Sequence, residues 1–523
     1  MRDTHFIETY IPSRFKPVQE GNLMSYAVPA DEIGELCHEL YFTHKLELIS
    51  ITADDRRASD GGFRIWYLFG IPKKDLFLAP YITLSGSESF PSITKDIHEA
   101  SPYERKIKTF FGLEPVGHPH PRPIILHENW PANLFPLRKD FDWRKRPPVA
   151  ENVYAFNAVE GEGIYEIPVG PVHAGIIEPG HFRFSVAGEE IMLLEAKLGY
   201  KHRGVEKLFE VLPLDQTIHL AESVSGDTSF THSLAFCQAL EVLSGAIVSK
   251  RSAYLRVIFS ELERLANHVN DIGFIMLDTG YSFGGSQGAR LREMIMQWNE
   301  RLSGSRFLRG LNVMGGVAKD IRGDLSKEFA FALRTWVHDF EQVIAVAEDS
   351  HSLLNRLEDA GKLDYQLALD HGALGIAGRA LGIACDARLN HPYAAYADLP
   401  FDIALENDGD VRARFYVRVK EVRTSVALIL KALEQIPAHG DLVAAKNTQL
   451  KKNGCALGLA EAWRGTISYF VETDASGHLA RVDVRDPSFV NWGVLGHAGK
   501  GNVVPDFPLI NKSFNLSYSG NDL

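Results

Sequence analysis

The sequence contains few cysteines, and none of them stands in a paired motif. Its 523 residues include no CxxC motif and only four cysteines, Cys37, Cys237, Cys385 and Cys455. Zinc and iron–sulfur sites need several thiolates at close spacing, so we expect this chain alone to build neither. A disulfide framework is also not expected in a chain without a secretory signal. We therefore expect four independent buried thiols, because free cysteine is among the most buried residue types.

Long apolar runs and an excess of positive charge are also missing. No run of 18 apolar residues occurs, so we expect no bilayer-spanning helix, and any membrane association would come through partners. The N-terminal residues lack the apolar core of a signal peptide. The net charge of −12 argues against a nucleic-acid binder, which needs a basic surface to neutralise phosphates.

What is present is an ordinary globular composition, 45% apolar and 23% charged, in a chain long enough for several domains. Residues 63–71 and 76–84 are rich in strand-forming residues, and residues 101–112 begin with Ser-Pro and end with Gly, as helices do. Proline then becomes too frequent for regular structure. We predict an α+β N-terminal domain over 1–141 and a basic, Pro-rich linker over 142–150.

The second predicted domain covers residues 151–523. Residues 163–200 show strand-like stretches between Gly/Pro turns. Beyond them, apolar residues recur at three- and four-residue spacing, as a packed helical bundle requires. This periodicity predicts long helices over 229–249, 252–278, 286–304, 323–356 and 411–436. The last 40 residues or so, rich in Gly, Pro and Asn, are expected to form an extended tail. The predicted fold class is an α+β domain followed by a mainly α-helical bundle core with a small β element.

Two titratable residues stand at unusual places. His173 lies in a Gly/Pro-rich turn between strand-like segments, where a backbone-held imidazole can face a cavity. A histidine of the surface or core is the commoner interpretation of such a residue. Asp278 lies at the end of an apolar helix, where a carboxylate is unfavourable unless it is paired.

Two further polar stretches are candidates. His202, Arg203 and Glu206 form a charged cluster just before a helical stretch, and a solvated helix end would explain them equally well. The polar, Gly-containing turn that begins at Ser223 looks like a metal-site loop without its ligands.

Several short motifs along the chain resemble two known families. In the first domain they are "FFG" (110–112), "GHP" (117–119) and "PLRKD" (136–140), in the order found in the 30-kDa subunit of respiratory complex I. The second domain is similar to the 49-kDa subunit of complex I and to the large subunit of membrane-bound group 4 nickel–iron hydrogenases. Its motifs are "GPVH" (170–173), "HRGVEK" (202–207), "ELERLANH" (261–268), "LDTG" (277–280) and "RLSGSR" (301–306). The fused order resembles the formate-hydrogenlyase and hydrogenase-4 type.

The resemblance implies that four metal-ligand positions have been vacated. The hydrogenase family holds nickel and iron with thiolates from R-x-C-G-x-C and D-P-C-x-x-C. This chain has "SVSGDT" and "DPSFVN" instead, which place Ser225, Thr228, Ser488 and Asn491 at those positions. Hydroxyls and an amide cannot bridge nickel and iron as soft thiolates do, so we expect no metal site here.

The complex I branch implies a quinone site in this subunit. By that resemblance His173 and Asp278 are the catalytic pair, and the headgroup tyrosine of the family falls at about Ser223. His202, Arg203, Glu206 and Ser223 are then expected to face the cavity or the cluster. An imidazole held by a carboxylate can supply a proton to a reduced quinone near neutral pH.

Three hypotheses follow from these resemblances. In the first, the chain binds no cofactor itself and passes electrons from a 4Fe–4S cluster of a small iron–sulfur partner to a quinone or similar acceptor. It would lie on the cytoplasmic side of the membrane, attached through ion-translocating partner subunits. In the second, it is a non-catalytic structural and coupling subunit. A working hydrogenase with unusual ligands is the third, and ligand chemistry disfavours it.

Overall fold

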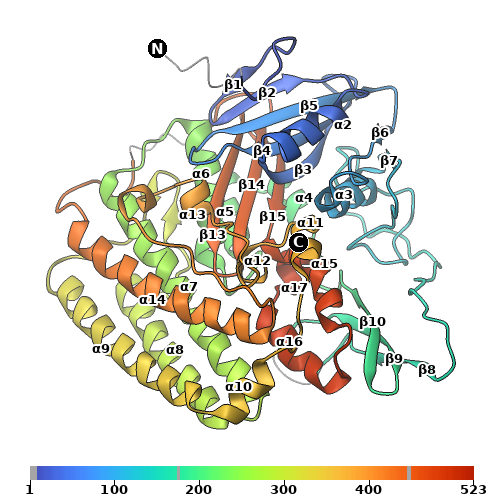
Figure 1. Cartoon of the computed structure of the whole chain (residues 1–523). Helices are drawn as coiled ribbons and strands as arrows, with labels where there is room; N and C mark the ends of the chain where they lie inside the picture. The colour runs from blue at the N-terminus through green and yellow to red at the C-terminus, as the bar shows by residue number, and fades with distance from the viewer. Residues whose placement is uncertain (1–8, 174–176, 445–448) are drawn as a thin grey trace.

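The computed structural model describes residues 9–173, 177–444 and 449–523 (Figure 1). Its N-terminal part is α+β, as predicted. One sheet has the strand order β1-β2-β5-β4-β3, in which only β2 and β5 run parallel. Its strands are β1 (Val18–Glu20), β2 (Leu23–Ala27), β3 (Glu47–Arg56), β4 (Gly62–Gly70) and β5 (Phe77–Ser85).

Helix α3 (Ser101–Phe111) packs on this sheet. Pro102 lies in its first turn, and Gly112 ends it with a φ of +70°, a conformation that glycine adopts without strain. The described residues 117–163 contain no helix or strand, as their proline content predicts. The other elements here are α2 (Ile33–His38), η1 (Glu39–Thr43), η2 (His98–Ala100), and the parallel pair β6 (Ser89–Pro91) and β7 (Glu114–Val116).

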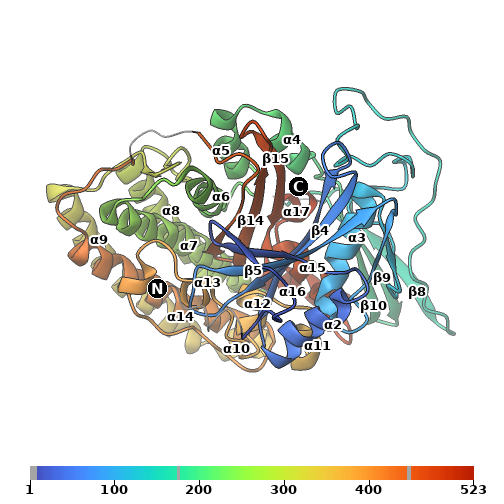
Figure 2. The same cartoon turned by 90° about the horizontal axis from the view of Figure 1, so that it is seen from above.

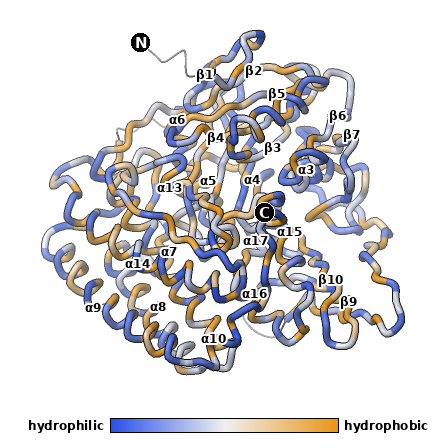
Figure 3. The backbone as a smooth tube through the Cα atoms, in the orientation of Figure 1, coloured by the Kyte–Doolittle hydropathy of each residue, from blue (hydrophilic) through white to orange (hydrophobic). Residues whose placement is uncertain are grey.

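Long helices form most of the second part. The longest are α7 (Lys250–Asp278), α8 (Ser282–Ser303), α9 (Gly323–Glu348) and α14 (Val411–Gln435), which pack together in Figures 1 and 2. On α9 the residues Phe329, Leu333, Trp336 and Phe340 are buried at three- and four-residue spacing, which confirms the predicted helical period. Figure 3 shows the corresponding alternation of hydrophobic and hydrophilic stretches along α8 and α9.

The remaining helices of this part before residue 400 are short, apart from α6. They are α4 (Val205–Val211), α5 (Leu214–Glu222), α6 (Ser229–Ser244), α10 (His351–Leu357), α11 (Tyr365–Asp370), α12 (Gly375–Arg379), α13 (Ala387–Asn390) and η3 (Tyr396–Asp398). The helix predicted over 323–356 is two helices, α9 and α10, because the chain leaves the helical conformation at Ser350.

The β structure of the second part is larger than the sequence suggests. The predicted small element is a hairpin sheet of β8 (Ile164–Val169), β9 (His181–Ala187) and β10 (Glu190–Lys197). A second sheet, of β13 (Cys455–Ala462), β14 (Gly465–Thr473) and β15 (Leu479–Arg485), lies at the centre of the molecule between α6 and the N-terminal sheet (Figures 1 and 2). The short strands β11 (Asn312–Val313) and β12 (Gly316–Val317) form a third sheet.

The two parts share an apolar interface between their sheets. It is formed by Leu23, Ile49, Trp66, Leu68, Phe77 and Ala79 from the N-terminal sheet and Cys455, Leu457, Leu459 and Phe470 from β13 and β14. An ion cluster lies in the same interface: Lys106 Nζ on α3 is 2.8 Å from Glu206 Oε1 on α4 and 3.0 Å from Asp483 Oδ1 on β15. All three side chains are buried, so the first domain is a fixed part of the fold.

The prediction of an extended C-terminal tail is wrong. Residues 487–523 form α15 (Pro487–Gly499), η4 (Val504–Asp506), α16 (Phe507–Phe514) and α17 (Tyr518–Asp522). The proline and asparagine residues that suggested a tail act as helix boundaries: Pro487 lies in the first turn of α15, and Asn515 ends α16 with a φ of +45°.

Candidate functional site

The two segments that carry the vacated ligand positions meet in the core. Ser225 follows α5, whereas Ser488 lies in the first turn of α15. Ser517, which caps α17, joins them: its Oγ lies 2.9 Å from Ser225 Oγ, and its backbone N–H donates to Ser488 Oγ at 2.9 Å. Ser225 and Ser488 are buried at 2% and 0% exposure. We call Ser225, Ser488 and Ser517 the hydroxyl cluster.

The other two vacated positions are also engaged in hydrogen bonds. Thr228 Oγ1 donates to Asp227 Oδ1 at 2.9 Å and accepts from Trp463 Nε1 at 3.1 Å. Asn491 is bound twice to the backbone of Leu374, accepting from its N–H at 2.9 Å and donating to its carbonyl at 3.1 Å. The Asn491 amide therefore holds the loop before α12, and no hydrogen bond joins it to the hydroxyl cluster within the described ranges.

An acid between the first two positions is paired with an arginine from the central sheet. Asp227 Oδ1 and Oδ2 accept hydrogen bonds of 2.8 Å from Arg464 Nη1 and Nη2, and Oδ1 also accepts one from Ser225. Arg464 lies in the turn between β13 and β14, over the Trp463 ring at 3.8 Å. Burial alone would raise the pKa of Asp227, but the charge and hydrogen bonds of Arg464 lower it to about 2. Sequence reasoning missed both residues.

A polar cavity of about 230 Å³ opens beside the hydroxyl cluster. Its walls come from the segment after His173, from the loop before α6 and from the last residues of the chain. They are Ile177, Glu178, Ser225, Gly226, Asp227, Arg464, Lys512, Asn515, Leu516, Ser517, Tyr518 and Ser519. The Asp227 side chain is 41% exposed and faces this space, so the cavity presents a fixed ion pair to anything that enters it.

Tyr518 is a second cavity residue that sequence reasoning missed. Its ring packs on Trp492, with centroids 4.9 Å apart, and lies where a side chain at Gly180 would have to be. Its hydroxyl is buried without a hydrogen bond of normal geometry among the described residues. Burial is the main reason that the pKa of Tyr518 is raised to about 12, so the phenol stays protonated at neutral pH and able to donate.

The predicted catalytic pair is not joined directly. His173 lies between β8 and β9, and its Nε2 is 2.7 Å from the Gly180 carbonyl oxygen, to which it donates. Asp278 is the last residue of α7 and is exposed at the surface. Desolvation by its neighbours raises the pKa of its carboxyl group, whereas the positive charge of Lys512 on α16 lowers this pKa. Among the described residues no hydrogen bond or ion pair links the two side chains, and neither residue lines the polar cavity. Their joint role stays a prediction.

The four residues expected to face the cavity or the cluster make the following contacts within this chain. His202 Nδ1 lies 2.8 Å from the Asp522 carbonyl oxygen, and Arg203 donates to the carbonyls of Ser223 and Val224 at 2.9 and 3.0 Å. Ser223 Oγ donates to the His219 carbonyl at the end of α5. Arg203 thus fixes the turn that leads to Ser225.

Glu206, the fourth of these residues, belongs to the interface between the two domains. Besides Lys106, it accepts a hydrogen bond from the Val484 N–H at 2.9 Å, and Arg481 lies 3.3 Å from it. None of the four is among the described residues that line the polar cavity. What they face in an assembly is still a prediction.

The cysteines do not gather at this site. Cys37, Cys237 and Cys455 are buried, as expected, whereas Cys385 is only partly buried. Burial raises the pKa of the Cys237 thiol on α6, which therefore stays protonated. Across the residues that the structure describes, no group of three or more His, Cys, Asp or Glu side chains is arranged to hold a metal ion.

Comparison with known proteins identifies the family. Residues 26–147 match the family model of the respiratory-chain NADH dehydrogenase 30 Kd subunit, and residues 278–455 and 447–522 match that of the 49 Kd subunit. Formate hydrogenlyase subunit 5 of Escherichia coli (strain K12) is 31% identical over 514 residues, which cover 96% of this chain and 90% of that protein. The chain belongs to the family of fused 30-kDa/49-kDa-type subunits.

Other members of this family of fused subunits agree. Hydrogenase-4 component G of the same strain is 32% identical, covering 96% of this chain and 89% of that protein. The fused C/D protein of the NADH-quinone oxidoreductase of Phocaeicola vulgatus is 30% identical, covering 77% and 80%. A chain of the archaeal membrane-bound sulfane sulfur reductase, a respiratory membrane complex, matches with a TM-score of 0.64 and 26% identity over 69% of this chain and 99% of that one.

This fused subunit is therefore a component of a complex I-like, hydrogenase-related assembly. The family match also confirms the predicted fold class, an α+β domain followed by a mainly helical core. Among the described helices, none combines the length and the hydropathy that crossing a bilayer requires.

Proposed function

We propose that this fused subunit passes electrons from a partner's iron–sulfur cluster to a quinone or similar small acceptor, without a nickel–iron centre. It would do so in the peripheral arm of a membrane-bound complex, on the cytoplasmic side and attached through ion-translocating partner subunits. The observation that supports the proposal is a hydrogen-bonded hydroxyl cluster beside a polar cavity, at positions that the resemblance assigns to the metal ligands of hydrogenases.

The residues at the former ligand positions do not fit nickel and iron. Soft thiolates hold these metals, whereas Ser225 and Thr228 are neutral hydroxyls that already donate to Asp227. Asn491 is held by Leu374 on both sides of its amide. Placing a metal there would break these hydrogen bonds and supply no thiolate in return, so we derive no step through a metal.

The cavity offers groups that suit an organic acceptor. Arg464 and Asp227 fix a strong local dipole, and Tyr518 adds a protonated hydroxyl that is buried beside Asn511. By the resemblance, the headgroup tyrosine of complex I subunits falls at about Ser223, and in our proposal Tyr518 would take its role. A volume of about 230 Å³ suits a small headgroup rather than a whole isoprenoid quinone.

Reduction of a quinone to a quinol takes two electrons and two protons. The electrons would come from the iron–sulfur partner, one at a time. In neutral His173, Nε2 carries the proton that it donates to Gly180, so Nδ1 is the basic nitrogen. One of the two protons would pass through Nδ1 of His173 while its other hydrogen bond holds the ring in place, and the second would come from water.

The second candidate function is a structural and coupling subunit without chemistry of its own. The buried cluster of Lys106, Glu206 and Asp483 favours it, because this cluster makes the two domains one stiff body able to transmit movement. Unchanged turnover of the intact complex after His173→Ala would support this alternative.

Metal analysis tests the proposed absence of a nickel–iron centre. The intact complex is purified without oxygen, and nickel is measured per copy of this subunit. We expect nickel far below one atom per chain and iron only in the amount that the iron–sulfur partners account for. Stoichiometric nickel would overturn this part of the proposal.

A further inference from the structure

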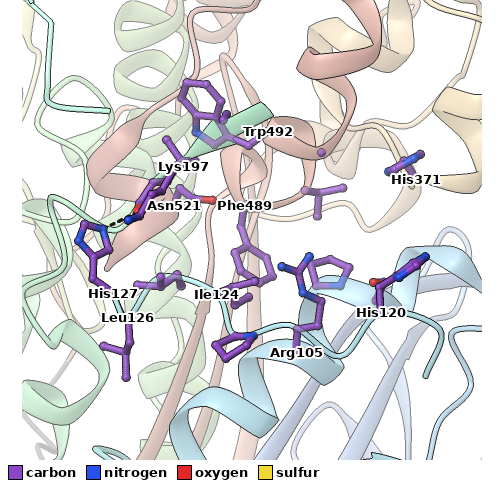
Figure 4. Close-up of a pocket in the computed structure, with 18 of the residues that line it drawn as sticks. Arg105, His120, Ile124, Leu126, His127, Lys197, His371, Phe489, Trp492 and Asn521 are labelled. Carbon is purple, nitrogen blue, oxygen red and sulfur yellow. Dashed lines mark hydrogen bonds between the residues drawn. The ribbon is translucent and has the colours of Figure 1, made fainter. Parts of the chain in front are cut away.

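A second cavity, of about 350 Å³, lies between the two domains and has a lining distinct from that of the polar cavity (Figure 4). Helix α3 and the Pro-rich segment after it form one wall, and β10, α15 and the residue after α11 form the other. We call it the arm cavity. Much of its wall is apolar, from Ile124, Leu126, Leu198, Phe489, Val490 and Trp492.

The polar part of the wall is basic. Arg105, Lys197, His98, His120, His127 and His371 line the arm cavity, and none of its described lining residues is an aspartate or glutamate. This is unusual in a chain whose net charge is −12. Lys197 is already neutralised, because its Nζ lies 2.9 and 2.7 Å from the two carboxylate oxygens of Glu128.

Arg105 is the cation that remains without a counter-ion. Its Nε donates to the Arg122 carbonyl at 2.8 Å, and no carboxylate in the described ranges lies within ion-pair distance of it. The nearby Glu195 is used by Tyr154 and Arg122. Burial lowers the pKa of Arg105 to about 10, so the guanidinium is charged at neutral pH and poorly solvated. Figure 4 shows it pointing into the arm cavity toward Phe489.

We propose that the arm cavity binds a small organic anion, with a carboxylate or phosphate group on Arg105 and an apolar body against Ile124, Leu126 and Phe489. A guanidinium pairs with either group through two parallel hydrogen bonds. A neutral ligand would leave Arg105 unpaired, and a bare inorganic anion would leave the apolar wall uncovered. The inference does not depend on the redox function.

Calorimetric titration of the full chain separates these requirements. Octanoate is the probe with both charge and apolar body, inorganic phosphate has charge alone, and octanol has the apolar body alone. We expect octanoate to bind saturably at one site and the other two to bind at least about tenfold more weakly. Absence of octanoate binding to the wild-type chain overturns the proposal, as does equal binding of octanol.

Variants assign the site to Arg105. Arg105→Met is expected to weaken octanoate binding by roughly tenfold or more, whereas Arg105→Lys retains the charge and part of the affinity. Arg301→Met is the matched control, because it removes an exposed arginine that is paired with Glu328 on another face. Equal octanoate affinity in Arg105→Met and Arg301→Met would place the ligand elsewhere and overturn the assignment.

A second kind of variant tests the apolar wall without removing a charged side chain. Ile124→Trp narrows the arm cavity from its partly exposed wall and leaves Arg105 in place. We expect it to melt near the wild-type temperature and to lose octanoate binding. If a folded Ile124→Trp chain binds octanoate as wild type does, the apolar body does not lie in this cavity, and the proposal fails.

Discussion

Arg464 holds Asp227 through two parallel hydrogen bonds, each 2.8 Å long, from Nη1 to Oδ1 and from Nη2 to Oδ2. The pair stands between Ser225 and Thr228, two positions that the resemblance to nickel–iron hydrogenases assigns to metal-binding thiolates. A fixed guanidinium and carboxylate thus supply the local charges of the site. The surrounding hydroxyls donate to that carboxylate and are not free to act as anionic ligands.

Asp227→Asn should destabilise the chain mainly above pH 4. The pKa of Asp227 is lowered to about 2, so its contribution to the free energy of unfolding is full above its ordinary value near 3.8 and is lost as the pH falls through about 2. Because the side chain is partly exposed, we expect a loss of only about 1 kcal/mol at pH 7. Denaturant unfolding of the variant and the wild type at neutral pH and near the lowered pKa measures it. An equal loss at the two pH values would contradict the assigned charge.

His371 should make the fold sensitive to mild acid. Burial, together with His98 and His497, lowers its pKa to about 4, with Asp370 acting in the opposite direction. Between its ordinary pKa of 6.5 and about 4, the unfolded chain therefore takes up a proton that the folded chain does not, and stability falls.

In His371→Gln, we expect the loss of unfolding free energy between pH 7 and pH 5 to be smaller than in wild type by about 1.5 kcal/mol. His478→Gln, which changes an exposed histidine, is the control and should behave as wild type. A wild-type pH dependence in His371→Gln would refute the prediction.

Lys106→Met should weaken the joint between the domains. The substitution leaves Glu206 and Asp483 buried without the lysine, although Arg481 remains close to both. We expect this loss to lower the free energy of unfolding by about 3 kcal/mol. Lys108→Met is the matched control on the same helix, since Lys108 pairs with exposed Glu114 and its loss should cost less than about 1 kcal/mol. Equal losses in chemical denaturation would show that the cluster does not stabilise the joint.

Asn491→Ala should cost more stability than Ser225→Ala. Asn491 forms hydrogen bonds with both the N–H and the carbonyl of Leu374 in the core. Its removal leaves two buried backbone groups unpaired and should lower the free energy of unfolding by about 3 kcal/mol. The Ser225 hydroxyl bonds only to side chains that have further hydrogen-bond partners. Its removal should therefore lower the free energy of unfolding by only about 1 kcal/mol. Urea unfolding of both variants measures the two losses of unfolding free energy. A larger loss in Ser225→Ala than in Asn491→Ala would contradict the structural role given to Asn491.

Helices with a clear apolar period could be predicted from the sequence. Helices α7 and α14 begin and end within two residues of the predicted bounds, because apolar residues recur at three- and four-residue spacing along both. Strands β13 and β14 could not, since they are buried on both faces and show no clear alternation of apolar and polar residues. Arg481, Asp483 and Arg485 on β15 look like surface residues in the sequence, yet the fold buries them through ion pairs and backbone contacts.

The candidate site was predictable only where motifs mark it. Ser225, Thr228, Ser488 and Asn491 follow from the family pattern, which also fixes which residue types are missing. Asp227 and Arg464 do not, because they stand 237 residues apart and only the fold brings them together. An acid between two vacated ligand positions was the one available signal.

Quinone reduction by the intact complex tests the central claim most directly. A low-potential artificial donor drives the wild-type complex and one with His173→Ala, and quinol formation is followed. We predict turnover in the wild type, a loss of at least about tenfold in the variant, and normal assembly of both. Equal turnover in the two complexes would contradict the role given to His173, and an assembled wild type that reduces no quinone would contradict an acceptor site in this subunit.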